Sequence, residues 1–76
     1  MAEDERVRIE VGFDGGGALA ALTSMHLVDQ LEEALAANAD GAFAIDAEDG
    51  RYTLTLRKIV YLKRFSRESR VGFGAL

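Results

Sequence analysis

The sequence predicts an α+β domain, in which one helix packs on a face of an antiparallel sheet of about five strands. Three stretches of the 76-residue chain predict this fold class. Residues 7–13 alternate apolar and polar side chains, as a strand with one buried face does. Residues 25–35 repeat apolar side chains at helical spacing. Residues 51–65 hold the longest run of strand-forming residues, so the expected order is β-β-α-β-β-β.

The first strand and its turn are the clearest local prediction. Val7, Ile9, Val11 and Phe13 would share the buried face of this strand. The glycine-rich segment that follows, Asp14 to Gly17, is predicted to be a hairpin connection, because glycine accepts the positive φ angles of tight turns. A phosphate-binding loop would instead run directly into a helix, and no lysine follows this loop.

The segment between this hairpin and the helix has two interpretations. Residues 18–22 (ALAAL) have the helix propensity of alanine and leucine, yet they also suit the returning strand of a hairpin. Thr23 and Ser24 are good N-cap residues, so the helix is expected to begin just after them. Residues 38–41 should end it, since asparagine and glycine favour left-handed caps.

The second half of the chain predicts three more strands. Residues 43–46 alternate in polarity, and Asp-Gly in residues 47–50 is a favoured hairpin turn. The fourth strand is expected over residues 51–56, with a bend at Arg57-Lys58 leading into the fifth over residues 59–65. Because Ile59 to Leu62 is apolar on both faces, this last strand is predicted to be central in the sheet, with the other elements packing onto it and its neighbour.

The domain organisation follows from length and composition. Residues 1–5 are acidic and expected to be disordered, and residues 6–76 form one small domain. Residues 66–69 are predicted to be a polar loop, and residues 70–74 a short edge strand. A chain without cysteine has no disulfide or thiolate metal site. With no signal-peptide pattern and no apolar run of about 20 residues, we expect a soluble cytoplasmic protein without membrane contact.

Charge is distributed unevenly along the chain. Residues 1–56 carry three arginines against twelve acidic residues, a net charge of −9, whereas residues 57–76 carry six basic residues against one glutamate, a net charge of +5. The basic segment can lie near acidic residues of the same or a sister chain, or it can face a polyanion. The net charge of −4 favours the first interpretation. The candidate polyanion- or partner-binding residues are Arg57, Lys58, Lys63, Arg64, Arg67 and Arg70.

Side chains capable of catalysis are few. His26 falls on the polar side of the first helical turn. Ser24 is not expected to contact it, because residues two apart on a helix do not face each other. Asp46, Glu48 and Asp49 cluster at a hairpin, where such residues build turns by themselves. We therefore predict no catalytic residue, no cofactor and no metal site, and expect a protein that is not an enzyme.

Six pieces of the chain form a pattern that spans nearly its whole length. They are Val7–Phe13, Thr23–Ser24, Ala34–Leu35, Glu48–Arg51, Ile59–Tyr61 and Arg70–Gly74. The pattern resembles a family of small actinobacterial proteins known mainly as a domain of unknown function, and its closing R-V-G-F-G is the distinctive part. The resemblance implies a cytosolic actinobacterial protein with a sheet and one capped helix, and it transfers no catalytic residue.

Two functional hypotheses follow. The first is a non-enzymatic interaction module that associates with itself or with another protein, because a small core, an expected edge strand and an apolar tail all favour association with a partner. The second is a protein that binds RNA or the ribosome through the basic residues of positions 57–70. The expected contacts of a homo-oligomer are Val71, Phe73 and Leu76.

Overall fold

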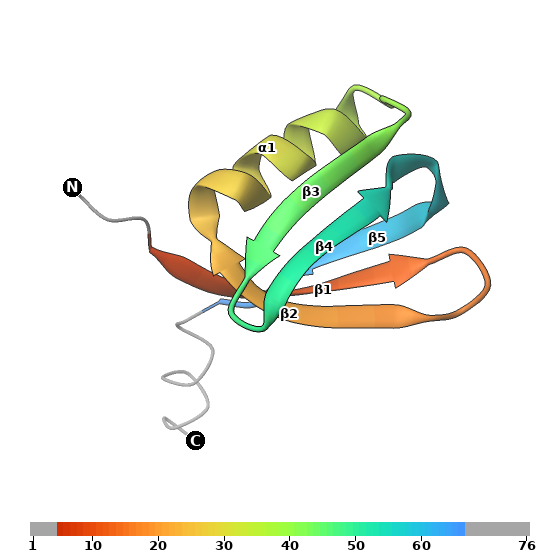
Figure 1. The fold of residues 1–76 in the computed structure, drawn as a ribbon. Coiled ribbons are helices and arrows are strands. Elements are labelled where there is room, and N and C mark those ends of the chain that lie inside the picture. The colour runs from red at the N-terminus through yellow and green to blue at the C-terminus, as the bar shows by residue number, and fades with distance from the viewer. Residues whose placement is uncertain (1–4, 67–76) are drawn as a thin grey trace, which may run out of the picture.

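The computed structural model describes residues 5–66, and it confirms an α+β fold with the predicted element order (Figure 1). The predicted strand at 70–74 and the expected oligomer contacts Val71, Phe73 and Leu76 lie outside the described residues. No helix in the described part of the chain is long and apolar enough to cross a membrane. The elements are β1 (Arg6–Phe13), β2 (Ala18–Ser24), α1 (Met25–Ala36), β3 (Ala42–Ala47), β4 (Gly50–Thr55), η1 (Leu56–Lys58) and β5 (Ile59–Arg64).

The ambiguous segment 18–22 is a strand. β2 pairs antiparallel with β1 from Arg6 opposite Ser24 to Gly12 opposite Ala18. Tertiary pairing along β1 overrides the high helix propensity of alanine and leucine. The hairpin connection is the glycine-rich one predicted, with Gly15 at φ 100° and Gly16 at φ 103°.

Helix α1 begins and ends at residues that suit its two ends. The Ser24 side chain accepts hydrogen bonds from the backbone N–H groups of His26 and Leu27, and so caps the N-terminus. At the other end Asn38 has a φ of 59°, which lets the chain turn away from the helix. Val28 and Leu31 lie on the face that packs on the sheet, and both are completely buried.

The sheet has the order β4-β3-β2-β1-β5 and consists of two parts that meet at a narrow seam. β2 and β3 are paired only at Thr23 and Ala47. The buried Thr23 hydroxyl donates a hydrogen bond of 2.6 Å to the carbonyl of Asp46 at this seam. The hairpin of β3 and β4 therefore diverges from the part formed by β5, β1 and β2, as Figure 1 shows.

The core lies between α1 and the inner face of this sheet. Ile9 and Val11 from β1, Leu31 from α1 and Ile45 from β3 are fully buried there. Burying such side chains contributes roughly 1.5–3 kcal/mol each, so β1 and α1 supply much of the stability of a domain this small.

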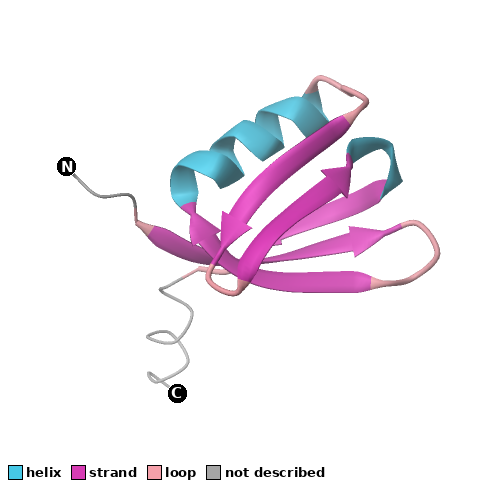
Figure 2. Cartoon of the chain, viewed as in Figure 1, coloured by secondary structure: helices cyan, strands magenta, loops and turns pink. Residues whose placement is uncertain are grey.

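The prediction that Ile59 to Leu62 forms a central strand is wrong. β4 and β5 occupy the two edges of the sheet, and the 3-10 turn η1 carries the chain from one edge to the other (Figure 2). The apolar residues of β5 are consequently not all covered, and the exposed fractions of Val60 and Tyr61 are 64% and 45%. β1, which pairs on both sides, is central instead.

Candidate interaction site along β5

One edge of β5 has no strand partner among residues 5–66. Its other edge pairs antiparallel with β1, where the Phe65 N–H donates to the Arg8 carbonyl at 2.9 Å. Hydrogen-bonded and non-hydrogen-bonded pairs alternate along an antiparallel ladder. Because Phe65 is hydrogen-bonded to β1, the alternation assigns the backbone groups of Lys63 and Tyr61 to β1 as well. The N–H and C=O groups of Leu62 and Arg64 then point toward the open side.

A β-bulge lies in the middle of this edge strand. Tyr61 is opposite Gly12 and Ile59 is opposite Phe13, so Val60 is the additional residue on β5. Val60 is also the most exposed large hydrophobic residue in the described part of the chain. An apolar side chain is thus presented at the edge, where a polar one would discourage association.

A groove of about 580 Å³ runs between this edge and the C-terminal half of α1. Four successive residues of β5 line it, and because their side chains alternate between the faces of the sheet, the groove follows the edge of the strand. Its charged lining residues are Glu32 and Arg57. The remaining lining residues are Leu35, Asn38, Ala39, Leu56, Ile59, Val60, Tyr61 and Leu62.

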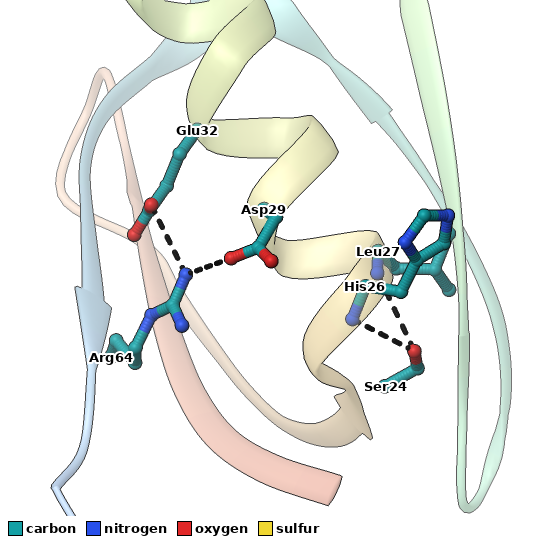
Figure 3. Close-up of polar contacts among 6 residues, drawn as sticks. All are labelled: Ser24, His26, Leu27, Asp29, Glu32 and Arg64. Carbon is teal, nitrogen blue, oxygen red and sulfur yellow. Dashed lines mark hydrogen bonds and ion pairs between the residues drawn. The ribbon is translucent and has the colours of Figure 1, made fainter. Parts of the chain in front are cut away.

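Arg64 ties β5 to the helix beside this groove. Its guanidinium Nη2 lies 2.8 Å from Asp29 Oδ1 and 3.1 Å from Glu32 Oε1 (Figure 3). The hydrogen bond that Arg64 donates to Asp29 is the main cause that raises the pKa of Arg64, so the group stays charged. Arg64 and the two carboxylates together carry a net charge of −1. The ion pair between Arg64 and Glu32 also explains why Glu32 is tolerated in the C-terminal half of α1 despite the helix dipole.

The four predicted basic residues that the structure describes lie in different surroundings. Arg57 lies 3.6 Å from Asp40, and both side chains are about 70% exposed. Arg64 faces the helix because it is opposite the core residue Ile9, whereas Lys63 is opposite Glu10 and points to the other face. The Lys63 ammonium lies 4.4 Å from the centre of the Phe65 ring, Lys58 is exposed, and Arg67 and Arg70 lie outside the described residues.

Tyr61 packs across the outer face of the sheet. A Cβ atom on Gly12 would clash with Tyr61 Cε2, so the ring occupies the space that the glycine leaves. The Tyr61 hydroxyl donates a hydrogen bond to Glu10 Oε2. That bond is the first cause that raises the pKa of Tyr61, followed by desolvation and the negative charge of Glu10. Aromatic packing over glycine thus joins β5 to β1.

Replacing Glu10 with alanine is expected to lower the pKa of Tyr61 toward that of free tyrosine, because the neutral phenol loses its acceptor. The folded-state pKa is raised, so the contact stabilises the fold below about pH 10 and is lost as pH rises through the folded pKa. Tyrosinate absorbance measured in a Tyr52→Phe background would report Tyr61 alone, since the chain has two tyrosines. An unchanged titration in the Glu10→Ala protein would contradict the contact.

The side chains considered for catalysis or metal binding have local structural roles or are solvated. The Ser24 hydroxyl caps α1, and the His26 side chain is exposed (Figure 3). Asp46 pairs with Arg51 at 3.1 Å, and Asp49 accepts a hydrogen bond from the Tyr52 hydroxyl. Within residues 5–66, no group of three or more His, Cys, Asp or Glu residues is placed to hold a metal ion.

The comparisons with known proteins add no relative. No protein-family model matches the chain, and no curated protein or solved structure matches it. The resemblance to the actinobacterial family therefore stays a prediction. The groove was not predicted from the sequence. The available signal was the apolar run Ile59 to Leu62, because it directly follows two cationic residues, which would not precede a buried strand.

Proposed function

We propose that this protein is a non-enzymatic interaction module that associates with a second copy of itself by pairing the free edges of the two β5 strands. The observation that carries this proposal is an edge of β5 that has no strand partner among residues 5–66, with the exposed bulge residue Val60 beside a groove. Addition of a strand to an open edge is a recurrent mode of recognition, in which backbone hydrogen bonds supply affinity and side-chain pockets supply specificity.

The backbone of β5 suits a two-fold axis at Leu62. The two copies of Leu62 would form a hydrogen-bonded pair, each donating its N–H to the carbonyl of the other. Arg64 of one chain would then lie opposite Val60 of the other, and the two helices would lie on the same side of the joined sheet. The axis thus uses the two residues whose backbone groups point to the open side.

Side-chain burial would add to these hydrogen bonds. Leu62 and Val60 face the groove, and pairing would remove both of them from water in each copy. The grooves of the two molecules would join across the axis, with Leu35 and Ile59 as their walls. Apolar residues of this kind are typical of the centre of a protein interface, and charged residues are typical of its rim.

The charges at the two ends of β5 are complementary under antiparallel pairing. The cluster of Arg64, Asp29 and Glu32 has a net charge of −1, while Arg57, Lys58 and Asp40 at the opposite end have a net charge of +1. Antiparallel association places each cluster near the oppositely charged cluster of the second copy, which favours this orientation over a parallel one.

Replacing Val60 with aspartate is expected to weaken self-association at least tenfold, about 1.4 kcal/mol, because each dimer would lose two apolar contacts and place two carboxylates beside the clusters of Arg64, Asp29 and Glu32, which already carry a net charge of −1. Val60 is exposed in the single chain, so folding should be unaffected. Sedimentation equilibrium from low to high micromolar concentration would measure the association. Thr53→Asp is the matched control, since Thr53 is exposed on β4 at the opposite edge. A wild-type monomer at every concentration, or equal weakening by both variants, would reject the proposal.

RNA binding is the alternative function, and the observation that supports it is the pairing of Lys63 with Phe65 on the face away from α1. It is the weaker proposal because Arg57 and Arg64 are ion-paired within the chain. Polyanion binding through Lys63 predicts an affinity for mixed RNA that falls steeply with salt and drops on Lys63→Glu substitution. No binding at low salt would exclude it.

A further inference from the structure

The face of the sheet that points away from α1 is a second candidate surface, separate from the open edge of β5. Tyr61, Lys63 and Phe65 of β5 lie on this outer face. Arg8 of β1 lies opposite Phe65, whose N–H donates to the Arg8 carbonyl. We propose that the outer face of β1 and β5 binds single-stranded nucleic acid, with a base stacked on Tyr61 and phosphates contacted by Arg8 and Lys63. The inference goes beyond self-association and does not depend on it, because one chain supplies every residue.

Tyr61 presents the flat face of its ring to a ligand. A Cβ atom on Gly12 would clash with three neighbouring ring atoms, Cδ2, Cε2 and Cζ, so one face of the ring lies over the glycine. The hydrogen bond from the Tyr61 hydroxyl to Glu10 fixes the orientation of the ring. Tyr61 is nevertheless 45% exposed. A ring with one face against the sheet and the other toward solvent is what stacking of a base requires.

Cationic side chains lie around this ring. Arg8 and Lys63 are exposed, and neither has an ion-pair partner among residues 5–66. The contact of Lys63 with the Phe65 ring, at 4.4 Å from its centre, keeps the ammonium on the outer face. By alternation Arg6 shares this face, and so does Glu10. Three cations against one carboxylate give the outer face of β1 and β5 a net charge of +2, which complements a phosphate backbone.

The acidic side chains of α1 are kept away from this face by the sheet itself. Packed layers lie roughly 10 Å apart, which exceeds the Debye length of about 8 Å at physiological salt. On the outer face of β3, Asp46 is paired with Arg51 at 3.1 Å. A bound phosphate would therefore meet the local positive charge, although the whole chain carries −4. Arg57 and Arg64, whose ion pairs weaken the RNA alternative, take no part in this site.

The spacing of these groups favours a single strand over other anionic ligands. Alternate side chains on a strand lie roughly 7 Å apart, so Tyr61 and Phe65 are separated by roughly 13 Å with Lys63 between them. A single strand exposes its bases for stacking and places phosphates between them. The bases of a duplex are stacked on one another and do not reach Tyr61. An acidic peptide would use the cations but leave the ring without a role.

Self-association would extend this surface without covering it. With the two-fold axis at Leu62, Tyr61 of one chain lies opposite Lys63 of the other. Both helices then lie on one side of the joined sheet, so both outer faces lie on the other side. A dimer would present two rings on one continuous face, and a longer strand could contact both.

Paired variants of the full chain test the stacking contact. The probe is a labelled single-stranded oligouridylate of about 12 nucleotides, and fluorescence anisotropy measures its binding. Tyr61→Leu keeps an apolar side chain over Gly12 but removes the ring, and it should weaken binding about tenfold. Tyr52→Leu is the matched control, because the Tyr52 hydroxyl also bonds to a carboxylate but the residue lies on β4. It should bind like the wild type.

Two further measurements test the phosphate contact and the ring separately. Arg8→Gln should reduce the slope of log affinity against log salt by about 0.7, the value for one phosphate contact on a single strand. Arg51→Gln removes a charge that is already paired with Asp46, so it should leave the slope unchanged. In the Tyr52→Phe protein Tyr61 is the only tyrosine, and its ring protons should shift upfield in NMR spectra when the oligonucleotide stacks on it.

The remaining outcomes are also decisive. No binding at low salt, equal binding by the Tyr61→Leu and Tyr52→Leu proteins, or equal binding of a duplex would overturn the inference. Unchanged Tyr61 ring resonances in the bound protein would exclude stacking even if the Tyr61→Leu protein failed to fold. An oligothymidylate that binds equally well would support a site for either nucleic acid, and one that binds less well would assign it to RNA. Oligonucleotide binding without self-association would reject the proposed function alone.

Discussion

Replacing Leu31 with alanine is expected to destabilise the fold by about 2–5 kcal/mol. Leu31 is completely buried between α1 and the sheet, so its loss removes apolar burial and leaves a cavity. A domain of this length has a total stability of roughly 4–11 kcal/mol, so the variant would lose a large part of it. Urea unfolding at a concentration below self-association would measure the change. A loss below about 1 kcal/mol would contradict the core described for α1.

Leu35 provides the matched control on the same helix. It is only half-buried and lines the groove beside β5. Leu35→Ala should therefore cost less folding stability than Leu31→Ala but should weaken the contacts made in the groove. The two variants separate the face of α1 that stabilises the domain from the face that contributes to binding.

Local patterns in the sequence were sufficient for most of the elements. The alternation of Val7, Ile9 and Val11 marked the strand that carries the core, and Ser24 marked the start of the helix. The glycines after Asp14 marked the hairpin. These features depend on neighbouring residues, so periodicity and capping rules capture them without knowledge of the tertiary structure.

The position of each strand in the sheet was not accessible in the same way. Ile59 to Leu62 has the composition of a central strand, yet η1 leads it past β4 to the opposite edge. Strand order depends on contacts between distant segments, which a local period does not contain. The same is true of the seam at Thr23, where one buried hydroxyl joins the two parts of the sheet.

The basic residues show the same limit at the candidate site. Their clustering after residue 56 was evident from the sequence, but their directions were not. Pairing with β1 turns Arg64 toward the acidic side of α1 and Lys63 to the other face. Arg64 and Lys63 are adjacent in sequence, yet Arg64 forms ion pairs with α1 whereas Lys63 is exposed to solvent.

A single cysteine at position 62 tests the pairing of β5 strands most directly, because the chain contains no other cysteine. A hydrogen-bonded antiparallel pair at the axis has a Cα separation of about 5.5 Å, which lies within the range that a disulfide spans. Leu62→Cys at high micromolar concentration should form a covalent dimer under mild oxidation, and it should do so much faster than Thr53→Cys on the edge of β4. Equal rates for the two variants, or no Leu62→Cys dimer, would contradict pairing through β5.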